Sequence, residues 1–403
     1  MNQSQIRNFC IIAHVDHGKS TLADRFIGSH DQFLDSHPIS KERGITIRLA
    51  PVTFAYKDYE FNLIDTPGHV DFSYEVERSL AACEGAILLV DATAGIQAQT
   101  LSHFVRAQRL GLTIIPVVNK IDLPNARVDE VVSELAQLVQ LAKSEVLLVS
   151  AKTGKGVTEL LATIVEKIPP PSGDPKSPLR ALVFSSQFET NRGVTAFIRV
   201  VDGQIKTKSK IIFLATKSEA TAFEIGHFAP AMKPVDTLES GEVGYIVTNL
   251  KTASLVKVGD TVSTVNPPTV NPLPGYKEPQ PMVFVSLFPV DQNEFYLLED
   301  GLSKLKLNDA ALTYVATSSK ALGRGFRCGF LGHLHAEVSQ ERLASDFGLS
   351  LIATVPTVNY ELDSTMNLRE PWVAATIICP SDYLGAVMPL CQDRRGILKN
   401  MEY

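Results

Sequence analysis

The sequence predicts a multidomain protein with an α/β domain first, an all-β domain second and an α+β region last. Three observations predict this order. Residues 1–168 alternate short apolar strands with helical stretches. Residues 179–268 contain short strands separated by Gly, Asn and Asp turns, a pattern typical of a small β-barrel. Residues 280–362 run strand, helix, strand, strand, helix, strand, which is the ferredoxin-like order.

Composition and charge narrow the class of protein. The chain has 403 residues, a net charge of −6 and a pI near 5.9, which argues against a surface coated in positive charge for nucleic acid but does not exclude a local basic patch. The five cysteines are scattered without a Cys-x-x-Cys pair, so they predict neither a zinc site nor a disulfide framework. The first seven residues are polar, and no apolar run reaches the length of a membrane span. A reduced, cytoplasmic setting fits best.

The α/β domain is expected over residues 1–172. Its predicted strands are Asn8–Ala13, Glu60–Ile64, Gly85–Val90, Leu112–Val118 and Glu145–Val149, and its predicted helices include Leu101–Leu110, Asp129–Leu141 and Val157–Ile168. Such alternation favours a mainly parallel sheet with helices on both faces. Ligands in these sheets bind at the carboxyl ends of the strands.

The run from Ala13 to Thr21 follows the first predicted strand and leads into a helix. In that context, backbone N–H groups wrap the phosphates of a nucleotide, Lys19 reaches the β- and γ-phosphates, and the Ser20 hydroxyl can bind Mg²⁺. Ala13 stands where the usual pattern has glycine, so a plain turn with a surface lysine is the alternative. The residues expected to contact the nucleotide here are Asp16, His17, Gly18, Lys19, Ser20 and Thr21.

Two further segments are suited to Mg²⁺ and the γ-phosphate. Arg43–Ile47 places Thr46 in a long polar connection, from which it could reach both and let go after hydrolysis. Asp65–His69 follows a strand directly, so Asp65 suits a water-mediated hold on Mg²⁺ and the Gly68 N–H suits the γ-phosphate. His69 would then stand beside the attacking water. The alternatives are a simple strand start and a common Asp-x-x-Gly turn.

Two segments predict that the base is guanine. Asn119-Lys120-Ile121-Asp122 follows a strand, and the Asp122 carboxylate can accept the two donors of guanine that adenine lacks. Asn119 can bond the base and the loop, and the Lys120 stem can lie along the ring. Ser150-Ala151-Lys152 follows the last strand and offers a backbone N–H to guanine O6. Five signals in order, each at a strand end, predict GTP and GDP as ligands.

These motifs resemble those of the translational GTPases. Ala-His-Val-Asp-His-Gly-Lys, Arg-Gly-Ile-Thr and Asp-Thr-Pro-Gly-His, beginning at Ala13, Arg43 and Asp65, are the forms that group uses. The resemblance implies that His69 orients the hydrolytic water and that the ribosome positions it. We therefore expect His69, Lys19 and Thr46 to be catalytic, with Ser20, Thr46 and Asp65 holding Mg²⁺. A capping or surface histidine is the alternative for His69.

A proline-rich stretch, Ile168–Pro175, leads into the predicted barrel, and four prolines between Pro267 and Pro274 lead out of it. Barrel strands are expected at Ala181–Ser185, Val194–Val200, Lys210–Ala215 and Val243–Val247. The ferredoxin-like elements are expected at Met282–Phe288, Glu294–Leu305, Ala311–Ala316, Gly325–Phe330, Leu334–Phe347 and Leu349–Val355. A further strand–helix–strand is expected at Val373–Cys379, Tyr383–Gln392 and Lys399–Tyr403, the start of a second, incomplete ferredoxin-like domain over residues 370–403.

The segment from Gly325 to Glu337 is close to a signature of the LepA family, also called elongation factor 4. Its two histidines, His333 and His335, lack the carboxylate or thiol of a metal set, so a strand-to-helix turn packed against a neighbouring domain is expected. Three departures stand out: His333 replaces a common leucine, the stretch from Ile27 to Thr46 is short, and the chain stops inside the next domain.

The sequence therefore predicts a ribosome-associated GTPase that hydrolyses GTP to GDP and phosphate with Mg²⁺. The resemblance implies ribosomal RNA and proteins as partners, with tRNA and a peripheral contact on the cytoplasmic face of the cell membrane as further expectations, and a monomer. Two alternatives stay open. One is a nucleotide-switched binding module that turns over negligibly, and the other is a fragment without ribosome-stimulated activity. The translational or assembly step is left open.

Overall fold

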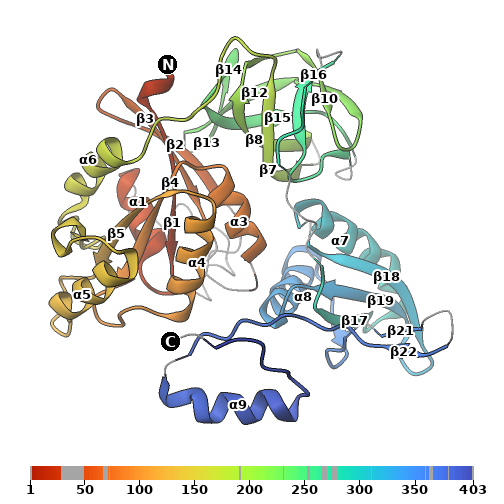
Figure 1. Cartoon of the computed structure of the whole chain (residues 1–403). Coiled ribbons are helices and arrows are strands. Elements are labelled where there is room, and N and C mark those ends of the chain that lie inside the picture. Colours follow the sequence, from red (N-terminus) through yellow and green to blue (C-terminus); the bar gives the residue numbers. More distant parts are fainter. Residues whose placement is uncertain are drawn as a thin grey trace. The chain divides into compact units, whose positions relative to one another are not determined.

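The computed structural model places most of the chain and divides it into two compact units, Met1–Asn359 and Tyr360–Tyr403, which are described separately (Figure 1). The described residues are 2–28, 50–66, 71, 73–189, 192–229, 231–251, 255–265, 270–274, 280–309, 311–358, 360–362, 366–379 and 381–401.

The first unit begins with a six-stranded sheet, here called the α/β region. Its strands are β1 (Ile6–Ala13), β2 (Ala50–Tyr56), β3 (Tyr59–Asp65), β4 (Gly85–Asp91), β5 (Thr113–Asn119) and β6 (Leu147–Leu148), in the order β2-β3-β1-β4-β5-β6. Every neighbouring pair is parallel except β2 and β3. The predicted parallel sheet is confirmed. Strand β2 was not predicted, and the strand predicted from Glu145 begins later because Lys143–Glu145 forms a 3-10 turn.

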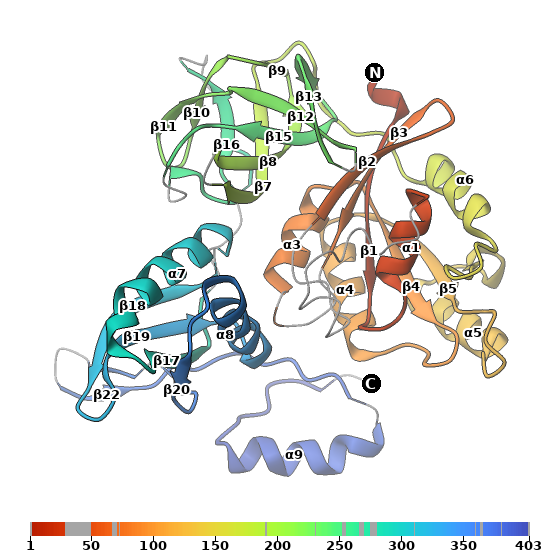
Figure 2. The same cartoon turned by 180° about the vertical axis from the view of Figure 1, so that it is seen from behind.

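Helices cover both faces of this sheet (Figures 1 and 2). Helices α1 (Lys19–Phe26) and α6 (Val157–Lys167) pack on one face. Helices α3 (Ser73–Ala81), α4 (Ala98–Arg109) and α5 (Val128–Val139) pack on the other. All eight residues of β1 are buried, and successive side chains point to opposite faces: Phe9 and Ile11 meet the first set of helices, Cys10 and Ile12 the second.

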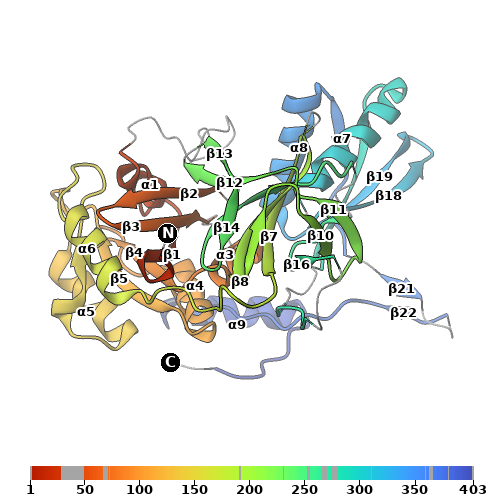
Figure 3. The same cartoon turned by 90° about the horizontal axis from the view of Figure 1, so that it is seen from above.

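An antiparallel all-β region follows. Its strands are β7 (Arg180–Glu189), β8 (Gly193–Asp202), β9 (Gln204–Lys206), β10 (Lys210–Phe213), β11 (Ser218–Thr221), β12 (Glu224–Ala229), β13 (Ala231–Val235), β14 (Thr237–Glu239), β15 (Val243–Val247) and β16 (Thr261–Thr264). Eight of them form one sheet in the order β11-β10-β16-β7-β8-β15-β12-β13, and β14 pairs with β9. The long strands β7 and β8 lie side by side (Figure 3). Alternate side chains such as Val183 and Ile198 fill its core.

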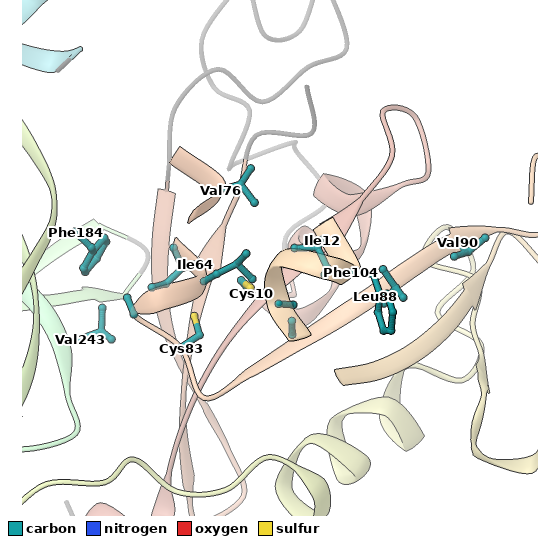
Figure 4. Close-up of a cluster of buried hydrophobic side chains, with 14 of the residues drawn as sticks. Cys10, Ile12, Ile64, Val76, Cys83, Leu88, Val90, Phe104, Phe184 and Val243 are labelled. Carbon is teal, nitrogen blue, oxygen red and sulfur yellow. The ribbon is translucent and has the colours of Figure 1, made fainter. Parts of the chain in front are cut away.

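The all-β region packs directly against the α/β region. Phe184 and Val243 belong to the same buried cluster as Cys10 and Val76 (Figure 4). The Glu84 carboxylate adds a polar tie, because its Oε1 lies 2.7 Å from the Arg199 guanidinium and its Oε2 accepts from Asn8 Nδ2 at 2.8 Å. The contact between the α/β region and the all-β region is therefore partly apolar and partly charged.

A four-stranded antiparallel sheet with two helices completes the first unit and is here called the α+β region. It runs β17 (Val283–Pro289), α7 (Phe295–Asn308), β18 (Thr313–Ser319), β19 (Gly323–Phe330), α8 (His333–Phe347) and β20 (Leu351–Ala353). The sheet order is β18-β19-β17-β20. This is the predicted ferredoxin-like order, with each boundary within a few residues. Leu298 and Leu302 of α7 and Leu343 of α8 are buried against the sheet.

The second unit contains a two-stranded ladder of β21 (Glu361–Leu362) and β22 (Leu368–Arg369), and helix α9 (Leu384–Asp393). The predicted helix is confirmed, but the strand predicted at Val373–Cys379 is wrong, because residues 371–379 form no strand. Residues 399–401 form none either, although Lys399–Tyr403 was predicted as one. A strand needs a partner ladder, and the described part of this unit offers these residues none. The side chains of Trp372 and Val373 are 65% and 62% exposed. None of the described helices is both long and apolar enough to cross a bilayer.

Candidate nucleotide-binding site

Four of the five predicted segments meet at one edge of the α/β sheet. The loop after β1 carries residues 14–18, Asp65 ends β3, Asn119 ends β5, and residues 150–152 follow β6. These are the carboxyl ends of parallel strands, where α/β sheets bind ligands. The structure thus brings together segments that lie more than 130 residues apart in sequence, residues 14–18 and 150–152.

Gly18 shapes the loop that precedes α1. It adopts φ +89°, in the left-handed region, and caps the helix N-terminus. A Cβ atom at this position would lie 2.5 Å from Asn119 Nδ2. Both the backbone angle and the close approach therefore require glycine. The N–H groups at the start of α1 and the helix dipole favour an anion here.

Lys19 and Asp65 form a buried ion pair beneath this loop. The Lys19 Nζ lies 2.8 Å from Asp65 Oδ1 and also donates to the Thr66 carbonyl. Asp65 is fully buried, whereas Ser20, one residue beyond Lys19 in α1, is half-buried and Thr21 is exposed. A carboxylate and a hydroxyl are oxygen donors of the kind that Mg²⁺ prefers, so the residues present fit that ion. Thr46, Gly68 and His69 lie outside the described residues.

Asn119 joins three of the segments. Its Nδ2 donates to the His17 carbonyl at 2.9 Å, and its Oδ1 accepts from the Ala151 N–H at 3.0 Å. Lys120 crosses the same edge, donating to the Asp16 carbonyl at 2.6 Å and lying 2.7 Å from Asp91 Oδ2. The loop after β1 is therefore held from the side on which a base would lie.

Asp122 lies at the rim of this edge. Its side chain is exposed, while Ile121 beside it is half-buried. A hydrogen bond from Ser150 lowers the pKa of Asp122, which keeps the carboxylate ionised and able to accept two donors. Ser150 itself is fully buried. The Ala151 N–H donates a hydrogen bond to the Asn119 side chain, whereas the Lys152 N–H has no hydrogen-bond partner among the described residues.

His17 is buried inside the loop, with its side chain only 2% exposed. Its Nδ1 accepts a hydrogen bond from the Asp91 N–H at 3.1 Å, so the ring is neutral at that nitrogen. Burial, and next the neighbouring His14, lower the pKa of His17 to about 4. The position is structural: a neutral ring links the loop to the end of β4.

Two side chains that the sequence analysis did not single out also hold this site. Gln99 Oε1 of α4 accepts from the Val15 N–H at 3.0 Å. Arg25, in the last turn of α1, donates from Nε to the Ala151 carbonyl at 3.0 Å and also to the Lys152 carbonyl. A basic residue in the last turn of a helix is a usable signal for Arg25. Nothing in the sequence pattern pointed to Gln99.

Asp71, six residues beyond Asp65 in the sequence, contacts the α+β region. Its Oδ2 accepts from the N–H groups of Leu334 at 2.8 Å and His335 at 3.4 Å, at the start of α8. The predicted packing of the strand-to-helix turn against a neighbouring region is confirmed. His335 Nδ1 accepts from the Leu331 N–H at 3.1 Å, so its Nε2 donates to Asp309 at 2.6 Å. His333 is exposed.

Comparisons with known proteins agree with this geometry. Residues 4–170 match the family model described as elongation factor Tu GTP binding domain, residues 193–263 match elongation factor Tu domain 2, and residues 367–403 match elongation factor G C-terminus. A crystal structure of a Thermus thermophilus protein superposes with a TM-score of 0.69 at 21% identity, covering 89% of this chain and 68% of that one, which shows the shared fold.

Curated relatives give the family. Elongation factor 4 of Bifidobacterium animalis subsp. lactis is 50% identical over 433 aligned positions, covering 100% of this chain and 69% of the relative. Elongation factor 4 of Halalkalibacterium halodurans is 48% identical, covering 100% of this chain and 71% of the relative. With these identities over the whole chain, and with matches to a GTP-binding domain, elongation factor Tu domain 2 and the elongation factor G C-terminus, this chain belongs to the elongation factor 4 family of translational GTPases.

Proposed function

We propose that this chain hydrolyses GTP to GDP and phosphate at the carboxyl edge of the α/β sheet, while bound to the ribosome. One observation carries the proposal. The side chain of Asn119 bonds the loop before α1 on one side and the 150–152 segment on the other, which joins a phosphate-binding element to a base-binding element. The relatives named elongation factor 4 support the ribosome as partner.

The phosphates would lie on the N-terminus of α1. There Lys19 would exchange its contact with the Thr66 carbonyl for the β- and γ-phosphates, as a point charge. Ser20, Asp65 and Thr46 would hold Mg²⁺, which when bound neutralises charge that develops on the phosphates. Because Asp65 is already paired with Lys19, the two side chains are positioned before nucleotide arrives.

Guanine would lie between Asn119, Lys120 and Asp122. The ionised Asp122 would accept the N1–H and the N2 amino group. We assign the contact with O6 to the Lys152 N–H, because the Ala151 N–H already donates to Asn119. The stem of Lys120 would cover the ring, since its ammonium is anchored by Asp91.

The chemical step would use His69 to orient the attacking water, with Gly68 donating to the γ-phosphate. Catalysis of this kind depends mainly on positioning and charge stabilisation. Contacts with tRNA, with ribosomal RNA and with the cytoplasmic face of the membrane, and a monomeric state, stay predictions. The relatives do not favour the alternative of a binding module without turnover.

Base choice tests the proposal. Asp122→Asn should weaken GTP binding and improve binding of xanthosine triphosphate, because the amide supplies a donor where the carboxylate accepts. Equilibrium titration with fluorescent GTP and xanthosine triphosphate would measure both. The matched control is Asp129→Asn, an exposed aspartate on α5. Full GTP affinity in Asp122→Asn would exclude Asp122 as the base-reading residue.

A further inference from the structure

A second cluster of potential ligands lies away from the nucleotide edge, where the α/β and all-β regions meet. Glu60 of β3, His227 of β12 and Glu242, just before β15, each offer one ligand atom, and these atoms all lie within 4.8 Å of one another. Glu60 and His227 are half-buried, and Glu242 is only 5% exposed. The cluster is assembled only when the two regions are in contact.

A neighbouring group orients each of the three side chains. His227 Nδ1 lies 3.2 Å from the Val243 carbonyl, which can only accept, so Nδ1 carries the proton and Nε2 keeps its lone pair. Glu242 Oε2 accepts from the Glu239 N–H at 2.7 Å. Glu60 Oε1 accepts from Asn62 Nδ2 at 3.4 Å. Outer hydrogen bonds of this kind are what hold metal ligands in position.

The carboxylate of Glu242 lies close to that of Glu60, and the Glu242 side chain is almost fully buried. Two carboxylates this close repel unless a proton or a cation lies between them. The arrangement therefore calls for a positive species at the centre of the three side chains.

We propose that Glu60, His227 and Glu242 form a binding site for a divalent transition-metal ion, for which Zn²⁺ is the best match, linking β3 to the all-β region. One imidazole and two carboxylates are ligands that Zn²⁺ accepts, with bonds of about 2.0–2.2 Å. In the tetrahedral geometry that Zn²⁺ prefers, ligand atoms at these bond lengths lie roughly 3.3–3.6 Å apart, so side-chain rotations that move the three atoms by about an ångström close the site. Three protein ligands leave one position for water.

Zn²⁺ titration of the full chain tests this proposal, in saturating GDP and Mg²⁺ so that the nucleotide edge is occupied. The wild type should bind one equivalent that His227→Asn does not bind and that Glu60→Gln binds at least tenfold more weakly. Two controls should keep the equivalent: Glu239→Gln, an exposed glutamate close to Glu242, and His333→Asn, an exposed histidine. Co²⁺ substitution should give a spectrum without thiolate charge-transfer bands, which separates this site from the cysteines.

Thermal unfolding provides a second readout that does not depend on the stoichiometry. Zn²⁺ should raise the unfolding midpoint of the wild type and of Glu239→Gln, and raise that of Glu60→Gln by less at the same concentration, because an ion that binds only the folded state stabilises it in proportion to its affinity. Equal Zn²⁺ binding by wild type, His227→Asn and Glu60→Gln would overturn the proposal. No bound equivalent in the wild type would overturn it as well, and would mean that the carboxylates share a proton instead.

Discussion

His17 is the residue whose burial has the clearest consequence. Folding moves its pKa from 6.5 to about 4. At neutral pH the ring is mostly uncharged in both folded and unfolded chains, so it contributes little there. As the pH falls below 6.5, the His17 ring binds a proton in the unfolded chain but not in the folded chain. The unfolded state therefore binds more protons in this range, and stability is lost as the pH falls.

We expect this histidine to remove about 2 kcal/mol of unfolding free energy between pH 7 and pH 5. His17→Asn keeps an acceptor for the Asp91 N–H but does not titrate, so its stability should fall less over the same range. Urea unfolding at several pH values would measure the difference. Identical pH profiles for wild type and variant would contradict the assigned burial of a neutral ring.

At the scale of single residues, motifs at fixed spacing located the candidate segments at the ends of predicted strands. Lys19, Asp65, Asn119 and the 150–152 segment come together as their positions at strand ends implied. The supporting side chains could not be predicted in the same way. Gln99 and Arg25 act through contacts made only in three dimensions, with no motif of their own.

At the scale of elements, the contact between Asp71 and helix α8 matters most. The first turn of α8 carries no acidic residue, and Gly332 at its N-cap has no side chain to accept a hydrogen bond. Asp71 supplies the missing acceptor from the segment that follows Asp65–His69. If Asp71 moved when the bound nucleotide changed, its hydrogen bonds to the start of α8 would change as well.

Asp71→Ala should lower the unfolding free energy by about 1 kcal/mol, the usual loss for a helix N-cap. The amides of Leu334 and His335 should exchange faster in hydrogen-exchange mass spectrometry. Asp71→Asn, which keeps an acceptor oxygen, should lose less. Asp300→Ala is the control, because it removes only an exposed pair with Lys304 on α7. Unchanged exchange at the start of α8 in Asp71→Ala would exclude the cap.

Element prediction succeeded for α5, whose apolar residues recur at helical spacing, and for β4, which is a continuous apolar run. It missed β2 and α3, although Val76 and Leu80 of α3 lie four residues apart and are both buried. It was wrong at Val373–Cys379, where a short and nearly continuous apolar run looks like a strand. An apolar pattern shows that a segment is able to form a β-strand. Whether the strand forms depends on a partner strand that lies elsewhere in the chain.

At the scale of the whole molecule, the two units differ in how their backbone N–H and C=O groups are hydrogen-bonded. Strands β1 and β4 are buried and paired on both sides. Residues 371–379 have neither a ladder nor a helix, and side chains such as Trp372 are largely exposed. Regions with few buried contacts open at low free energy.

We therefore expect amides 371–379 to exchange close to the intrinsic rate, while those of β1 exchange only through global unfolding. Helix α9, in the same unit, should be intermediate and provides the internal comparison. Hydrogen-exchange mass spectrometry of the full chain would show all three. Protection of 371–379 equal to that of β1 would mean that these residues pair with a strand.

GTP turnover measured with and without ribosomes tests the central claim most directly. The account predicts hydrolysis of GTP and not ATP, a rate that rises when ribosomes are added, and loss of most of that rise in His69→Ala with nearly unchanged GTP affinity, because a water-orienting group acts in the transition state. His333→Asn, at an exposed position, should behave as wild type. Equal turnover of GTP and ATP, no rise with ribosomes, or an undiminished rise in His69→Ala would contradict it.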